Sequence, residues 1–217
     1  MTKARRRTVI SRLLPVVGLA VALAPTTACS KEAGPGASPR GPATTTSQAE
    51  AILQVVGVPS DRDFAGGSFE FADPFVGGSS AEDGRLASSS WDVYFVRDTG
   101  DVGAWGAGLD IFDSVEAAQR SAQKVATFSV CEGPRQPVDG IDGSDYDVLE
   151  AISCPRVADD GYVAYVSASD GVVTANLTVS GPTRTSATTA VVEVWASLSE
   201  TAQGAVERLP RSAPGAG

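Results

Sequence analysis

The chain has 217 residues, with 17 basic and 26 acidic side chains and no histidine. Without the basic segment 1–28, 12 basic residues remain against 26 acidic ones, and this acidity argues against nucleic acid as a partner. The lack of histidine removes the commonest general base and the commonest zinc ligand, so we expect no catalytic residues, no metal site and no cofactor.

The N-terminal 28 residues have the layout of an export signal. A basic stretch precedes the apolar run 13–25, which is shorter than the roughly 20 residues that a spanning helix needs. Small residues end this run directly before Cys29, an arrangement that resembles the lipobox of bacterial lipoproteins. We therefore expect cleavage after residue 28, lipidation of Cys29, and anchoring on the extracytoplasmic face of the cell membrane. The alternative is an ordinary secretory signal cut near Ala28, and the pair Arg6-Arg7 leaves Sec or twin-arginine export open.

The cysteine count supports lipidation independently. Three cysteines in an exported protein leave one thiol unexplained. If Cys29 carries lipid, Cys131 and Cys154 remain as a pair in an oxidising compartment. We expect a disulfide between them, worth about 3 kcal/mol through its restriction of the unfolded chain. Two free buried thiols are the alternative.

Segment composition divides the exported part into a tether, one domain and a tail. Residues 30–47 contain mostly Pro, Gly, Ser, Thr and Ala, and with Cys29 they are expected to form a disordered tether. Residues 210–217 have the same character. Between them, residues 48–209 are expected to form a single globular domain.

The first part of this domain contains one clear helix signal. Ser47-Gln48-Ala49-Glu50 matches a capping box, and the helix is expected to end at Val56 before Gly57. Residues 60–90 are rich in Gly, Ser and Asp, which predicts long loops with one strand at 68–71.

From Trp91 onward the pattern predicts strands and two further helices. Apolar alternation predicts a hairpin of strands 91–98 and 102–112, and Asp113 to Glu116 forms a second capping box that opens a helix to about residue 128. Three strands and a closing helix are expected over 146–154, 161–169, 172–180 and 186–209. Helical periodicity predicts buried apolar stripes on both helices, at Val115, Ala118, Ala122 and Val125 and at Val191, Val194, Trp195, Leu198, Ala202 and Val206. The order helix, strands, helix, strands, helix predicts an α+β fold. Its antiparallel sheet is expected to have helices packed on one face and the other face partly open.

The open face is the expected ligand site. Trp91, Val93 and Phe95 alternate with Tyr94, so Tyr94 is turned away from the helices. Tyr165 and Asn176 are expected on the same open face, where rings and amides suit a ligand groove. If their strands were adjacent and in register, Tyr94 and Tyr165 would form a semi-rigid platform. An ordinary solvated sheet face is the alternative.

An acidic cluster lies between the middle helix and the later strands. Asp139, Asp142, Asp145 and Asp147 are close enough in sequence to suggest calcium ligands. Their spacing does not match an EF-hand loop, so a solvated acidic turn is the preferred interpretation.

The portion 114–209 resembles a known sensor domain. It contains a helix beginning "DSVEAAQRSAQ", then Cys131, then Cys154 ahead of a hairpin, then an Ala-rich closing helix. This pattern resembles the extracytoplasmic sensor domain of actinobacterial membrane Ser/Thr kinases of the PknH type, which also occurs on free-standing lipoproteins. The resemblance implies a non-catalytic ligand-binding or sensing module with a cleft.

The identity of the ligand stays open between a small molecule, a lipid and an envelope protein. One alternative to a sensor is a lipid or glycolipid carrier, and another is an interaction protein of the cell envelope. An apolar cavity under the sheet would favour the carrier, whereas a shallow polar groove would favour the sensor.

Overall fold

The computed structural model describes residues 44–210, except 65–66, 73, 78, 81–82, 98–101, 125–130 and 157–160. All of these residues belong to Pro39–Gly217, the second of two units into which the chain divides. The expected signal peptide, Cys29, the tether up to residue 43 and the tail from residue 211 lie outside the described residues.

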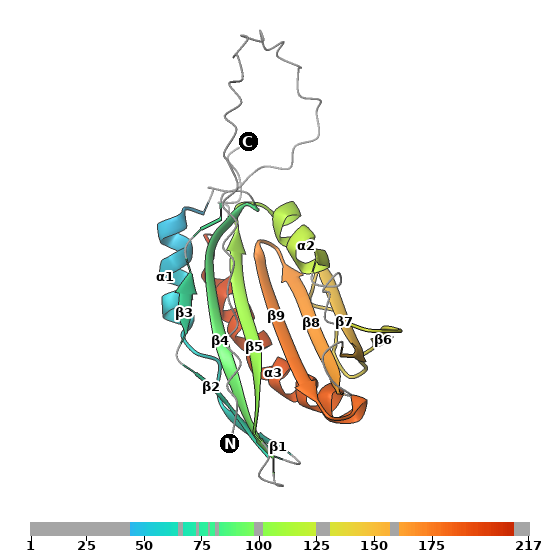
Figure 1. Ribbon diagram of the computed structural model, residues 1–217. Coiled ribbons are helices and arrows are strands. Elements are labelled where there is room, and N and C mark those ends of the chain that lie inside the picture. The colour runs from blue at the N-terminus through green and yellow to red at the C-terminus, as the bar shows by residue number, and fades with distance from the viewer. Residues whose placement is uncertain are drawn as a thin grey trace, which may run out of the picture. The chain divides into compact units, whose positions relative to one another are not determined.

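A nine-stranded antiparallel sheet forms the centre of the described unit (Figure 1). Its strands are β1 (Arg62–Phe64), β2 (Gly67–Phe71), β3 (Phe75–Gly77), β4 (Arg85–Arg97), β5 (Val102–Phe112), β6 (Gln136–Pro137), β7 (Val148–Pro155), β8 (Tyr162–Asp170) and β9 (Val173–Gly181). They pair in the order β1-β2-β4-β5-β9-β8-β7-β6, and β3 pairs with β4 as well. With three helices among the described residues, the structure confirms the predicted α+β class and element order.

One face of the sheet, here called the inner face, carries the hydrophobic core. Trp91 and Val93 on β4 lie opposite Ala107 and Trp105 on β5, so their apolar side chains share this face. Leu177 on β9 continues the same row, since it pairs with Ala107. The alternation that predicted the hairpin is therefore confirmed, because every second residue from Ala87 to Phe95 and from Trp105 to Ile111 is buried.

Helix α1 (Thr46–Val56) packs against the inner face but begins earlier than predicted. Its N-cap is Thr45, whose hydroxyl accepts from the backbone N–H of Gln48 at 3.3 Å. The Gln48 side chain in turn accepts from the Thr45 backbone N–H at 2.9 Å. The expected box from Ser47 to Glu50 is therefore wrong by two residues, because Thr45 and Gln48 offer the same reciprocal pair. The helix ends at Val56 as expected, with Gly57 at φ 71°.

Helix α3 (Arg184–Arg208) covers the same inner face. Thr183 caps it, and its hydroxyl accepts from the Ser186 backbone N–H at 3.1 Å. Its buried stripe includes most of the residues predicted from the sequence, namely Val191, Val194, Trp195, Leu198 and Ala202. Within the described part of the chain, no helix combines the length and the apolar character needed to cross a membrane.

Helix α2 (Val115–Lys124) lies on the opposite face, so the expected placement of helices on one face holds only for α1 and α3 (Figure 1). Phe112 follows the inner-face residue Ile111, so it points to the opposite side and packs with Ala117 and Ala118 in a separate cluster. Val115, expected in the buried stripe, is 38% exposed. The buried residues of α2 are alanines, which would fit against either face of the sheet, so the sequence did not decide which face α2 covers.

Residues 60–90 contain more structure than the expected loops. They include β1, β2, β3 and the first residues of β4, which starts at Arg85 and not at Trp91. Phe69 and Phe71 on β2 are buried and lie opposite Phe95 and Val93 on β4. These pairings supply the burial that stabilises such short, Gly- and Ser-rich strands.

Candidate functional site

The candidate site lies on the face opposite the core, here called the outer face. Side chains that lie directly opposite each other on neighbouring strands point to the same side of a sheet. By this register the outer face carries Ser90, Asp92 and Tyr94 on β4, Gly106, Gly108 and Asp110 on β5, Thr174, Asn176 and Thr178 on β9, and Tyr165, Ser167 and Ser169 on β8. Its β8 side is buried, whereas Asp92, Tyr94, Gly106 and Thr178 are exposed.

Tyr94 and Tyr165 share the outer face but do not form the expected platform. Strands β5 and β9 lie between β4 and β8, which separates the two backbones by about 14 Å at the usual strand spacing. Tyr94 is 43% exposed, but Tyr165 is only 1% exposed. The platform prediction is therefore wrong, because sheet order is set by long-range pairing and not by alternation within a strand.

Tyr165 is a core residue of the outer face. Its hydroxyl has no hydrogen-bond partner in the described part of the structure. Burial raises the pKa of this phenol. A buried hydroxyl without a partner loses its hydration without compensation, so Tyr165 contributes through the packing of its ring.

Asn176, the third predicted ligand residue, is half-buried in a polar cluster with the buried Asp110 and Ser167 and the partly exposed Arg85, here called the buried polar cluster. The Ser167 hydroxyl donates to Asn176 Oδ1 at 2.6 Å, and Asn176 Nδ2 lies 3.5 Å from Asp110 Oδ2. Arg85 Nη1 lies 3.6 Å from Asp110 Oδ1 and forms an ion pair with it. The cluster thus connects β4, β5, β9 and β8 across the outer face.

Asp110 is the electrostatic centre of this cluster. Burial raises its pKa, although a hydrogen bond with Ser88 and the charge of Arg85 act in the opposite direction. A carboxyl whose pKa is raised by folding supports the fold at low pH and loses that contribution as pH rises through the raised pKa. No signal in the sequence marks the burial of this residue, since a polar side chain between Leu109 and Ile111 fits an ordinary alternating strand.

The buried polar cluster also has unused hydrogen-bonding capacity. Thr174 lies between Asp110 and Ser169 in the strand register. Among the described residues, the hydroxyls of Thr174 and Ser169 and the Oδ1 atom of Asp110 are buried without a hydrogen-bond partner. Buried polar groups normally find a partner in the protein, in water or in a ligand. This part of the outer face can therefore accept additional polar partners.

Two glycines border the cluster and form a strip without side chains on β5. Gly106 and Gly108 lie between Asp92 and Ser90 on β4 and Thr178 and Asn176 on β9. A Cβ atom added at Gly106 would meet no atom within 4 Å. The β4–β5 register shifts only between Arg85 and Ala87, so these glycines do not mark a bulge. They instead leave the backbone open to close approach from outside.

A hollow of about 360 Å³ lies where β1, β2 and β4 meet. Its lining combines carboxylates with an aromatic and an aliphatic side chain: Asp61, Arg62, Asp63, Ser68, Phe69, Glu70, Tyr94 and Val96. Apart from Tyr94 and the strand expected at 68–71, the sequence does not indicate this site, because the rest of the segment 60–90 has the composition of loops. We refer to it as the acidic hollow.

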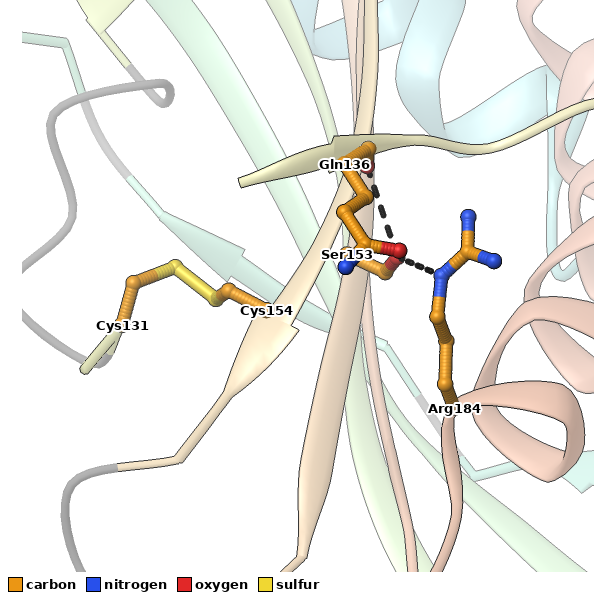
Figure 2. The surroundings of a disulfide bond; sticks show 5 residues. All are labelled: Cys131, Gln136, Ser153, Cys154 and Arg184. Atoms are coloured by element: carbon orange, nitrogen blue, oxygen red, sulfur yellow. Dashed lines mark hydrogen bonds between the residues drawn. A yellow bond between two sulfur atoms is a disulfide. The ribbon is translucent and has the colours of Figure 1, made fainter. Parts of the chain in front are cut away.

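The structure joins Cys131 and Cys154 in a disulfide with a Cα–Cα distance of 5.5 Å, as predicted. Figure 2 shows this bond on one side of β7 and Arg184 on the other. Arg184 donates to the Ser153 hydroxyl at 3.1 Å and to the Pro137 carbonyl at 2.8 Å. The disulfide and Arg184 thus hold β7 from both sides, and neither group adjoins the glycine strip.

The acidic cluster between Asp139 and Asp147 behaves as a solvated turn. Asp142 accepts from the Ser144 backbone N–H at 2.9 Å, which lowers the pKa of its carboxyl. Asp147 accepts from the Gly171 backbone N–H at 2.9 Å and braces the β8–β9 turn. In the described part of the chain, no group of three acidic or cysteine side chains is arranged to hold a metal ion.

No family model matches the chain, and searches of curated proteins and of solved structures also returned no match. The resemblance to PknH-type sensor domains therefore stays a prediction.

Proposed function

We propose that this protein is a lipid-anchored extracytoplasmic module that binds a ligand without transforming it, in the manner of a sensor. Its ligand would lie on the uncovered part of the outer face. The observation that carries this proposal is the glycine strip beside the buried polar cluster. A ligand resting on Gly106 and Gly108 can approach the backbone closely and reach the amide of Asn176.

The side chains around the strip favour recognition of a polar ligand. Asp92 and Thr178 are exposed on its two sides, and Tyr94 offers a partly exposed ring on the same face. A tyrosine ring contributes a large contact area at low entropic cost, and the carboxylate, hydroxyl and amide provide directional hydrogen bonds. This combination suits specific binding of one ligand orientation.

The polar character of the acidic hollow favours a binding module over a lipid carrier. A carrier would hold acyl chains in an apolar cavity, whereas this hollow is lined by three carboxylates, Asp61, Asp63 and Glu70. The net negative charge of the chain would also repel anionic lipid headgroups.

The proposed anchor follows from the pairing of the other two cysteines. Since Cys131 and Cys154 form a disulfide, Cys29 is left as the odd cysteine of the three. Its position after an apolar run and small residues suits lipidation. Acyl chains on one cysteine are sufficient to hold an acidic domain at a membrane surface.

Replacing Cys29 with alanine should abolish membrane retention. We expect the Cys29→Ala protein to appear in the soluble fraction or to accumulate as an uncleaved precursor, because no acyl chain can be attached. Membrane fractionation with intact-mass analysis measures both outcomes. The Cys131→Ala/Cys154→Ala protein is the matched control, and it should remain in the membrane. Normal processing and retention of Cys29→Ala would refute the anchor.

Filling the glycine strip should remove the ligand. We expect native mass spectrometry of the protein, extracted from its own membranes in mild detergent, to detect a bound molecule that Gly106→Leu loses. A side chain at Gly106 meets open space, so the fold should tolerate it. Gln203→Leu, on the exposed side of α3, adds an equivalent side chain elsewhere and should keep the ligand. Equal retention by Gly106→Leu and wild type would show that the strip is not the site.

A further inference from the structure

We propose that the acidic hollow and the adjoining outer surface of β3 and β4 bind an arginine-containing peptide segment of a partner protein. This inference rests on the proposed function, because the hollow opens on the same outer face. It goes further by assigning the chemistry of the partner. Three features support it: the charge of the hollow, its exposed aromatic ring, and the exposed apolar side chains of Val96 on β4 and Phe75 on β3.

The pairing of β1, β2 and β4 places negatively charged side chains near the ring of Tyr94. Glu70 on β2 lies directly opposite Tyr94 on β4, and Asp92 is the next outer-face residue along β4. At the next outer-face position along β4, Val96 lies opposite Ser68 on β2, and Ser68 lies opposite Asp63 on β1. Asp61 adds a further carboxylate to the lining of the hollow.

Among the described residues that line the hollow, the single basic one does not neutralise this charge. Arg62 donates to both carboxylate oxygens of Glu200 on α3, each at 2.6 Å. Its positive charge is therefore paired with a carboxylate that does not line the hollow. The hollow keeps an excess of negative charge, which is complementary to a cationic ligand.

The exposed ring selects among cationic ligands. Tyr94 is 43% exposed and Val96 is 47% exposed, so a small hydrated cation would leave these apolar surfaces in water. A guanidinium group stacks on a tyrosine ring while it donates to neighbouring carboxylates, a combination that suits arginine better than lysine. Arginine also has an aliphatic stem that can cover Val96.

The distance between the exposed side chains of Val96 and Phe75 indicates a peptide and not a free amino acid. Phe75 on β3 is 74% exposed and lies opposite Ser90, six residues along β4 from Val96. This separation is about 20 Å at the usual rise of a strand. An extended segment of about six residues covers that distance, with apolar side chains over Phe75 and arginine in the hollow.

A peptide titration tests the proposal. The probe is a fluorescein-labelled octapeptide with arginine at its first position and leucine at its seventh, so that both side chains point to the same side of an extended chain. It is titrated into the protein purified in nonionic detergent as the cell processes it. We expect saturable binding that weakens as salt increases. The Asp63→Asn/Glu70→Gln protein should bind about tenfold more weakly, because it lacks two carboxylates near the guanidinium. Tyr94→Ala should weaken binding as well.

Two controls separate site binding from general attraction to an acidic protein. Glu193→Gln/Glu207→Gln removes two exposed charges from α3 and should bind as wild type does. The same peptide with citrulline in place of arginine should not bind. Equal weakening by the α3 variant, undiminished binding of the citrulline peptide, or no binding of the arginine peptide would each overturn the proposal.

The result also separates this inference from the proposed function. If Gly106→Leu loses its native ligand while the arginine peptide fails to bind wild type, only the assignment of the partner fails. If Gly106→Leu has no effect on native ligand and Asp63→Asn/Glu70→Gln weakens the peptide, the hollow binds peptides and the strip is not a ligand site.

Discussion

Tyr165→Ala is expected to lower the free energy of unfolding by about 3 to 5 kcal/mol, as removal of large buried aromatic side chains generally does. The ring is 1% exposed, so its loss leaves a buried cavity beside β8. Tyr94→Ala, on the same face, should change stability by less than about 0.5 kcal/mol because the ring is partly exposed. Urea denaturation of both variants measures this difference.

Tyr165→Phe separates the ring from its hydroxyl. Since the hydroxyl has no hydrogen-bond partner among the described residues, its removal should leave stability unchanged or raise it by up to about 1 kcal/mol. A marked loss in Tyr165→Phe would reveal a hydrogen bond made by this hydroxyl. A small loss in Tyr165→Ala would mean that the ring is not part of the core.

Breaking the disulfide is expected to cost about 3 kcal/mol, because it closes a loop with a sequence separation of 23 residues. Cys131→Ala/Cys154→Ala should therefore unfold at lower urea concentration than wild type. Reductant should shift the wild-type midpoint in the same direction, since reduction releases the same constraint on the unfolded chain. Thiol alkylation with intact-mass analysis, before and after reduction, counts the cysteines that the bond protects.

The double alanine variant is also the control for the reductant. Reductant should leave its midpoint unchanged, because Cys131 and Cys154 are no longer present. Identical midpoints for the oxidised and the reduced wild type would contradict a stabilising role of the bond. Ser153→Ala, on the other side of β7, tests whether the Arg184 contact contributes separately.

Local patterns in the sequence were sufficient to predict most of the helices and strands. The alternation of Trp91, Val93 and Phe95 predicted a strand and its inner face, because side chains of a strand point alternately to its two sides. The apolar stripe of α3 was predicted in the same way from helical periodicity. The Cys131–Cys154 pair followed from the cysteine count.

Other features depended on contacts between residues far apart in the chain. The strands β1, β2 and β3 are short, and they are stable only because β2 and β3 pair with β4 and β1 pairs with β2. The acidic hollow that β1 and β2 form with β4 was therefore not predictable from residues 60–90. The face chosen by α2 was undecided too, since its alanines fit against either side of the sheet.

The sequence by itself determined which residues of each strand share a side, and so it placed Tyr94, Tyr165 and Asn176 on one face. Only the tertiary structure decided which strands are neighbours and which part of that face α2 covers. Pairing β5 with β9 separated the two tyrosines and brought Asn176 next to Asp110 and Ser167. The physical reason is that alternation is a local property of the backbone, whereas sheet order depends on the total burial of the folded chain.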